Sequence, residues 1–335
     1  MPRTPWVLGA LLACLVVALP ASAERTLLRA SAWIDGDSDA THGGVTIVVE
    51  DGRISAIESP AFPATAGDEV IELAGHTLLP GLMDLHVHLL GESNPRRYLE
   101  RYTLNPADMA LRGVVFARRT LEAGFTTVRD LGAEATAIVA LRRGIASGEF
   151  AGPRIIAATS SLASTGGHGD PSNGLNRRLA WDPTPSDGVV NSIDDAKQAV
   201  RQRYKDGADW IKITATGGVL SMAKSGQNPQ FTEDEIAAIV ATARDYGYEV
   251  AAHAHGTEGI KRAIRAGVAT VEHGTYMDDE AMRLMKKHGT YWVPTLSAGR
   301  FVAEQAKVEG FYPEVVRVKA ATIGPLMQQT FVKAY

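Results

Sequence analysis

The chain has 335 residues, of which 45% are hydrophobic, and its net charge is −4. A chain of this size and composition is typical of a soluble globular protein with an ample core. The near-neutral charge, without a basic stripe, gives no reason to expect nucleic acid as a partner.

Residues 1–23 predict a secretory signal peptide. Arg3 supplies a short positive region, residues 6–19 are apolar, and the Ala-Ser-Ala sequence at 21–23 fits a cleavage site. The apolar run is too short to span a bilayer. We therefore expect a mature chain that starts at Glu24, is periplasmic or secreted, and has no membrane segment after cleavage.

Cys14, the only cysteine, lies in this segment. It leaves a lipoprotein as a second interpretation, although Leu12 is unusual for a lipidation site. After cleavage the protein has neither a thiol nor a disulfide. Any metal site in the mature chain would therefore use His, Asp, Glu or a modified Lys.

Residues 24–79 predict a small β module, interpreted as an incomplete β-sandwich. Residues 46–50 alternate between polar and apolar side chains, and residues 53–58 follow after Asp51-Gly52. An Asp-Gly pair between two such segments is a strong hairpin signal.

From residue 80 to residue 335 strands and helices alternate, which indicates an α/β fold. Seven strand–helix units in succession favour a TIM-like (β/α)8 barrel whose last strand is missing from this chain. An open doubly wound sheet is the alternative, but no glycine-rich phosphate-binding turn follows the first strand. The strands are expected at 82–88, 125–130, 154–159, 209–215, 249–254, 268–273 and 290–295, with helices near 107–123, 136–147, 192–206, 232–246, 257–266 and 278–288.

The last segment, 313–335, reads as a helix that Gly324-Pro325 interrupts. An eight-stranded barrel would need one more strand after Tyr335. We therefore expect that the chain is a fragment of a longer one.

Histidines gather where the barrel strands end. His86 and His88 are two residues apart, so on a strand they point to the same face. Active sites of such barrels lie at the carboxyl ends of the strands, and imidazole is a common ligand of zinc-like metals. Six of the nine histidines lie at strand ends or in one connecting loop: His86, His88, His168, His253, His255 and His273. The other three, at 42, 76 and 288, read as surface residues.

Lys212 lies between two β-branched residues of a strand that is expected to be buried. A bare ammonium is costly there, so one interpretation is an ion-paired or snorkelling lysine. The alternative is a carbamylated lysine, because burial lowers the pKa of the amine and a neutral amine takes up carbon dioxide. The carbamate has two oxygens that can bridge two metal ions.

These residues together resemble the amidohydrolase superfamily. The segment from Pro80 to His88, followed by Lys212, His253 and His273, carries the resemblance. Within the superfamily the chain is most similar to the imidazolonepropionase-like and Xaa-Pro dipeptidase group, and especially to bacterial members that hydrolyse ochratoxin and related carboxyl-terminal amides.

The resemblance implies two divalent metal ions, with zinc as the expected metal, and a role for each matching residue. His86 and His88 would hold the first metal, His253 and His273 the second, and carbamylated Lys212 would bridge both. His168 would contact the substrate or polarise its carbonyl. Lys212 and His168 are the two candidate catalytic residues. The remaining candidates for substrate binding are His255, Gly217, Gly218, Val219 and Leu220.

The implied activity is hydrolysis of an amide bond in a dipeptide or N-acyl amino acid with a free carboxylate, by a hydroxide that two metals share. A cyclic amide or lactone hydrolase is the alternative, as is an inactive metal-binding fragment. In the family, an Asp at the end of the eighth strand binds metal and carries the proton, and such a residue would lie beyond Tyr335. Asp130 reads as a structural carboxylate. The resemblance also implies a homo-oligomer.

Overall fold

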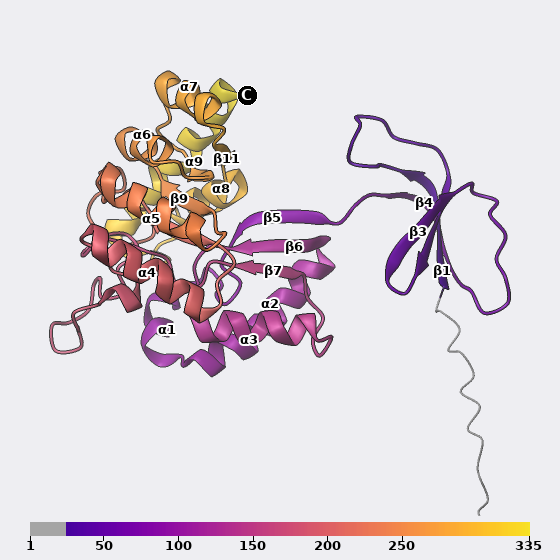
Figure 1. Ribbon diagram of the computed structural model, residues 1–335, viewed down its shortest axis with the longest axis horizontal. Coiled ribbons are helices and arrows are strands. Elements are labelled where there is room, and N and C mark those ends of the chain that lie inside the picture. The colour runs from indigo at the N-terminus through magenta and orange to yellow at the C-terminus, as the bar shows by residue number, and fades with distance from the viewer. Residues whose placement is uncertain (1–24) are drawn as a thin grey trace, which may run out of the picture. The chain divides into compact units, whose positions relative to one another are not determined.

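The structure is a computed structural model that describes residues 25–335 (Figure 1). The predicted signal peptide at 1–23, with Cys14, lies outside the described residues. The described chain forms two compact units, which divide between Pro80 and Gly81. Each unit is described by itself.

The first unit contains one four-stranded sheet with the order β3-β2-β1-β4. β1 pairs antiparallel with β2 and parallel with β4, and β2 and β3 form the predicted hairpin around Asp51-Gly52. Both turn residues have positive φ, as a tight two-residue hairpin requires. No second sheet faces this one among residues 25–80, so the predicted sandwich is not confirmed. The strands are β1 (Arg25–Trp33), β2 (Val45–Glu50), β3 (Arg53–Glu58) and β4 (Glu69–Leu78).

The second unit has the α/β fold that the sequence predicts, with seven parallel strands at the predicted places. They form two sheets, β5-β6-β7 and β8-β9-β10-β11, and an isolated parallel bridge from Leu162 to Ile213 joins the segment after β7 to β8. Within the described residues no strand pairing joins β11 to β5, so the predicted barrel is not closed. The strands are β5 (Leu82–Val87), β6 (Phe125–Asp130), β7 (Arg154–Ala157), β8 (Ile211–Thr214), β9 (Val250–Ala254), β10 (Thr270–His273) and β11 (Tyr291–Val293).

Helices follow the strands, and Figure 1 shows α2 and α3 near the strands β5 to β7. α5 begins at a capping box, in which Thr232 and Glu235 satisfy each other's backbone amides. α9 continues through Pro325, where the sequence indicated an interruption. No helix between residues 25 and 335 is long and apolar enough to cross a membrane. The helices are α1 (Arg97–Thr103), α2 (Pro106–Glu122), α3 (Ala135–Ala146), η1 (Pro185–Asp187, a 3₁₀ turn), α4 (Ile193–Asp206), α5 (Glu233–Asp245), α6 (Thr257–Arg265), α7 (Asp279–His288), α8 (Leu296–Gln305) and α9 (Glu314–Ala334).

The largest core lies around β8, β9 and β10. Every residue of β8 and β9 is buried, because parallel strands are covered on both faces. Ile211, Ile213 and Val271 pack with the apolar faces of α4, α5 and α6. The strands are thus fixed along their length, and their carboxyl ends meet at one edge.

Candidate metal centre

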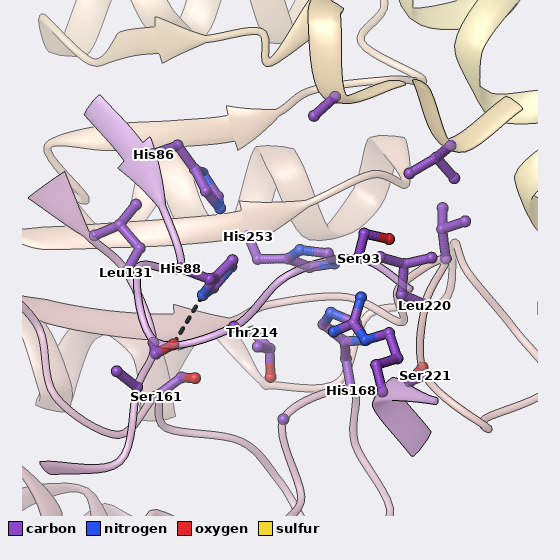
Figure 2. Close-up of a pocket in the computed structure, with 18 of the residues that line it drawn as sticks. His86, His88, Ser93, Leu131, Ser161, His168, Thr214, Leu220, Ser221 and His253 are labelled. Atoms are coloured by element: carbon purple, nitrogen blue, oxygen red, sulfur yellow. Dashed lines mark hydrogen bonds between the residues drawn. The ribbon is translucent and has the colours of Figure 1, made fainter. Parts of the chain in front are cut away.

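One cavity of about 700 Å³ lies at the carboxyl ends of the strands (Figure 2). β5 and β9 each end inside a pair of histidines: His86 and His253 lie in the strands, and His88 and His255 follow them. β8 supplies Lys212, and β10 ends at His273. His168 comes from the loop after β7. All seven predicted polar side chains line this cavity: His86, His88, His168, Lys212, His253, His255 and His273.

The imidazole rings lie close to one another. The ring centroid of His273 lies 4.8 Å from those of His86, His253 and His255. The rings of His86 and His88 are 5.4 Å apart. Ligand nitrogens of His253, His255 and His273 all lie within 4.8 Å of one another. The structure therefore joins His255, predicted only as a substrate contact, to the group that has metal-binding geometry.

In five of these histidines one ring nitrogen is held by the protein. Nδ1 of His86 donates to the Glu272 carboxylate at 2.8 Å, and Nδ1 of His88 donates to the Gly132 carbonyl at 2.8 Å. Nε2 of His253 donates to the Gly217 carbonyl at 3.2 Å. The Nδ1 atoms of His255 and His273 each lie 2.7 Å from a threonine hydroxyl, those of Thr275 and Thr295. Such bonds orient metal-ligating histidines and leave the second nitrogen as the ligand.

Removal from water lowers the pKa of all six histidines, and it is the largest cause in each. His253 and His255 are 4% exposed, and the pKa of His255 falls to about 3. Burial also lowers the pKa of His86, His88 and His273. The rings are therefore neutral at pH 7, which is the form that binds metal.

Lys212 is 3% exposed between Ile211 and Ile213. Burial lowers the pKa of its amine to about 8. The Glu272 carboxylate opposes this shift, and the Arg129 guanidinium adds to it. Within residues 25–335 its Nζ forms neither a hydrogen bond nor an ion pair. Burial disfavours the ammonium, so the neutral amine forms at a lower pH than it does in water.

His168 occupies the side of the cavity next to His253. The two rings stack with centroids 4.2 Å apart and planes at 23°. Nδ1 of His168 is buried without a hydrogen-bond partner in the described chain, and burial lowers the pKa of the ring to about 3. An unpaired polar atom in such a place is costly and is typical of a functional side chain.

The four other predicted substrate contacts divide into two pairs. Val219 and Leu220 line the cavity. Gly217 and Gly218 do not line it, and instead lie behind the histidines. A Cβ at Gly218 would come within 2.1 Å of the His168 ring, so this contact requires glycine.

A buried ion cluster behind the cavity was not found from the sequence. Glu272 is fully buried in β10 and accepts from Arg129 of β6 at 2.9 Å as well as from His86. The guanidinium carbon of Arg129 lies 4.5 Å from the ring centroid of Trp210. The available signal was one charged residue next to a valine in each of the two strands, Arg129 after Val128 and Glu272 after Val271.

Asp130 has the structural role that the sequence indicated. Its two carboxylate oxygens accept from the backbone amides of Leu89 at 2.6 Å and Gly132 at 3.0 Å. Gly132 in turn accepts from His88, so Asp130 fixes the segment that orients that ring.

This set of donors fits divalent metal ions of the zinc type. It offers neutral imidazoles with fixed tautomers and a buried lysine whose amine is easily deprotonated, all around one cavity. Within the described residues no thiol takes part, so softer sulfur-based sites are excluded.

Comparisons with known proteins identify the family of the chain. A profile of the amidohydrolase family matches residues 77–320. Ochratoxinase from Aspergillus niger is 30% identical over 308 residues, which are 84% of this chain and 61% of that protein. This chain therefore spans less than two thirds of the length of that curated relative.

Two solved structures are also similar. A Xaa-Pro dipeptidase with methionine bound in its active site is 50% identical, with a TM-score of 0.89 over 93% of this chain and 77% of the other. A prolidase in complex with N-methylphosphonate-L-proline is 31% identical, with a TM-score of 0.82 over 92% of this chain and 76% of the other.

Glu272→Gln tests the buried ion cluster. The substitution leaves the Arg129 guanidinium buried without a countercharge, so the free energy of unfolding should fall by about 3–5 kcal/mol. Chemical denaturation measures this loss. Glu314→Gln, which removes an exposed ion pair with Arg317, is the matched control and should leave stability unchanged. A stability of the Glu272 variant equal to that of the wild type would contradict the assignment.

The metal-free chain should lose stability as the pH falls below 6.5. The unfolded state binds protons near pH 6.5, whereas the folded pKa values of these histidines are lower, so stability rises with pH in that window. His255, with a pKa of about 3, should contribute a loss of roughly 1.4 kcal/mol between pH 7.5 and 5.5, and the other histidines add in the same direction. Urea denaturation at the two pH values measures this change. Equal stability at both would show that the rings protonate freely when folded.

Proposed function

This chain belongs to the amidohydrolase family, and from that premise we propose that it is a metal-dependent hydrolase of small amides. Its family and its relatives support hydrolysis of an amide bond. The proposed substrate is a dipeptide or N-acyl amino acid with a free carboxylate. The observation that carries the proposal is the convergence of six histidines and Lys212 on one cavity.

The proposed metal ligands follow from the family resemblance, and their position around one cavity supports them. His86 and His88 would hold one ion, His253 and His273 a second, and His255 lies within reach of the second. Lys212 would bridge them as a carbamate, which forms when its neutral amine adds to carbon dioxide and releases a proton. Ions bound there would polarise the amide carbonyl and make water a nucleophile at neutral pH.

The protein side chains would orient the substrate around this centre. His168 lies against His253 at the cavity edge, where it would hydrogen-bond to the substrate carbonyl. Val219 and Leu220 would contact the apolar part of the substrate. We also propose export to the periplasm or secretion, on the basis of residues 1–23, which lie outside the described structure.

Arg97 is the candidate group for the substrate carboxylate. Three arginines of α1 and α2 line the cavity, and two of them are engaged. Arg101 donates to the carbonyls of Pro171 and Asn173, and Arg112 pairs with Glu100 at 3.2 Å. Within residues 25–335 Arg97 forms no ion pair. Its guanidinium carbon lies 5.8 Å from the ring centroid of Tyr98. A guanidinium in a cavity that has no ion-pair partner suits bidentate binding of a carboxylate.

The metal content of single variants tests the ligand assignment. The wild-type chain should bind about two zinc ions, whereas His86→Ala, His273→Ala and Lys212→Ala should each lose metal, because a ligand is removed from a shared site. Carbon-13 bicarbonate should give a carbamate resonance in the wild type and none in the Lys212 variant. His42→Ala, in the first unit, is the control and should bind as the wild type does. Full metal content in Lys212→Ala would exclude the bridging role.

A substrate panel tests the proposed class. Xaa-Pro dipeptides and N-acyl amino acids should be hydrolysed faster than lactones, and faster than the same amides with a carboxamide in place of the free carboxylate. Arg97→Gln should reduce the preference for the carboxylate by roughly tenfold, mainly through KM, because the pairing charge is lost. Arg143→Gln, on the exposed face of α3, is the control. Faster turnover of lactones would favour the alternative activity.

A further inference from the structure

The loop after β8 forms one wall of the cavity without regular secondary structure. Between β8 and α5, residues 219–222 line the cavity, while Gly217 and Gly218 lie behind the histidines. Figure 2 labels Leu220 and Ser221 of this loop and His168 among the residues of the cavity. A loop of this kind must be held by contacts outside itself if it is to fix side chains.

Lys319 of α9 provides such a contact. Its Nζ donates to three carbonyls of the loop, those of Gly218 and Ser221 at 2.8 Å and of Ala223 at 2.7 Å. An ammonium has three donors, so all three are used on this loop. Lys319 has no carboxylate partner among the described residues, and burial lowers its pKa to about 8.

The three carbonyls need a cation because their negative ends converge on one point. Without the ammonium the three carbonyls would repel one another, and those of Ser221 and Ala223 would lose their hydrogen-bond donor. The Gly218 carbonyl would keep only the bond from the Ser221 hydroxyl at 3.3 Å, so the loop would favour an open arrangement. A further bond ties the same loop to α1, since the Tyr98 hydroxyl donates to the Leu220 carbonyl at 3.0 Å. That single bond does not reach the glycine end of the loop.

The loop transmits this constraint to two histidines. Gly217 accepts from Nε2 of His253, and Gly218 is in such close contact with the His168 ring that a Cβ there would clash. The two rings stack on each other. If the loop were displaced, the ring of His253 would lose the hydrogen bond that fixes its tautomer, and the ring of His168 would lose the contact that fixes its position.

We propose that Lys319 is a positioning residue, whose ammonium gathers the 218–223 loop and thereby orients His253 toward metal and His168 toward substrate. The consequence for metal and substrate rests on the function proposed above. The ordering of the loop does not depend on it.

Lys319→Met tests the ordering of the loop directly. The variant removes the ammonium but keeps an apolar chain of similar length. Exchange of the loop is followed at the Gly217 amide, which donates to the Asn228 carbonyl at 3.0 Å. This exchange should accelerate by roughly tenfold or more, while exchange in β8 and β9 stays unchanged. Lys333→Met is the control, because Lys333 lies on the same helix and pairs with the exposed Asp279. Unchanged exchange of the loop in Lys319→Met would overturn the proposal.

Restoration of the charge separates positioning from a loss of packing. In a Cys14→Ser background, Lys319→Cys is alkylated with 2-bromoethylamine. The thiolate displaces bromide, and the new thioether carries an ammonium at the length of lysine. Alkylation with 2-bromoethanol gives the neutral counterpart. Loop protection should return with the amine and not with the alcohol, and equal recovery with both reagents would overturn the role of the charge.

Zinc titration by calorimetry connects the loop to the metal centre. Loss of a group that orients a ligand lowers metal affinity by roughly 10–100-fold, so Lys319→Met and the alcohol adduct should bind one zinc ion about tenfold more weakly than the amine adduct. If the wild type binds no zinc, the proposed function fails, whereas the exchange experiment still decides the role of Lys319. Equal zinc affinity in all variants would overturn the link to His253.

Discussion

The site depends on the hydrogen bonds that hold one ring nitrogen in five of its six histidines. An imidazole presents a defined lone pair only when its tautomer is fixed. The Glu272 carboxylate fixes His86, the Gly132 carbonyl fixes His88, and the Gly217 carbonyl fixes His253. Burial adds to this constraint because it keeps the rings neutral. A cluster of free histidines at the surface would have neither property.

Burial of polar groups in the site is unfavourable, and residues of the strands behind the cavity offset it with hydrogen bonds and an ion pair. Glu272 and Arg129 are charged and buried, and each makes several polar contacts, so neither charge is left alone. Asp130, also buried, accepts from the backbone amides of Leu89 and Gly132 and so holds the segment after β6 in place. The polar layer under the histidines is therefore satisfied by the protein itself. Lys212 is the exception, since its amine has no partner among residues 25–335, which agrees with a lysine that is modified in use.

Much of this site follows from local pattern. Alternation on a strand places His86 and His88 on one face, and parallel strands bring their carboxyl ends to one edge, so the position of the histidines could be derived from spacing alone. The seven strands were found because each is an apolar run bounded by turn residues. The ion pair of Glu272 and Arg129 was not predicted, because the two residues are 143 positions apart and no local pattern shows that they meet.

The sequence by itself determined the α/β class, the parallel strands and the residue types at the site, because these depend on periodicity and short spacing. Tertiary structure decided the rest. It grouped the ring of His255 with those of His253 and His273, which could hold a metal ion, and it placed Gly217 and Gly218 behind them. It also brought the ammonium of Lys319, about 100 residues along the chain, to the carbonyls of the loop after β8. It also gave the first unit a single sheet among residues 25–80. In the second unit, no pairing between described strands closes a barrel. Such features depend on contacts between distant segments, and no local pattern encodes the distance between them.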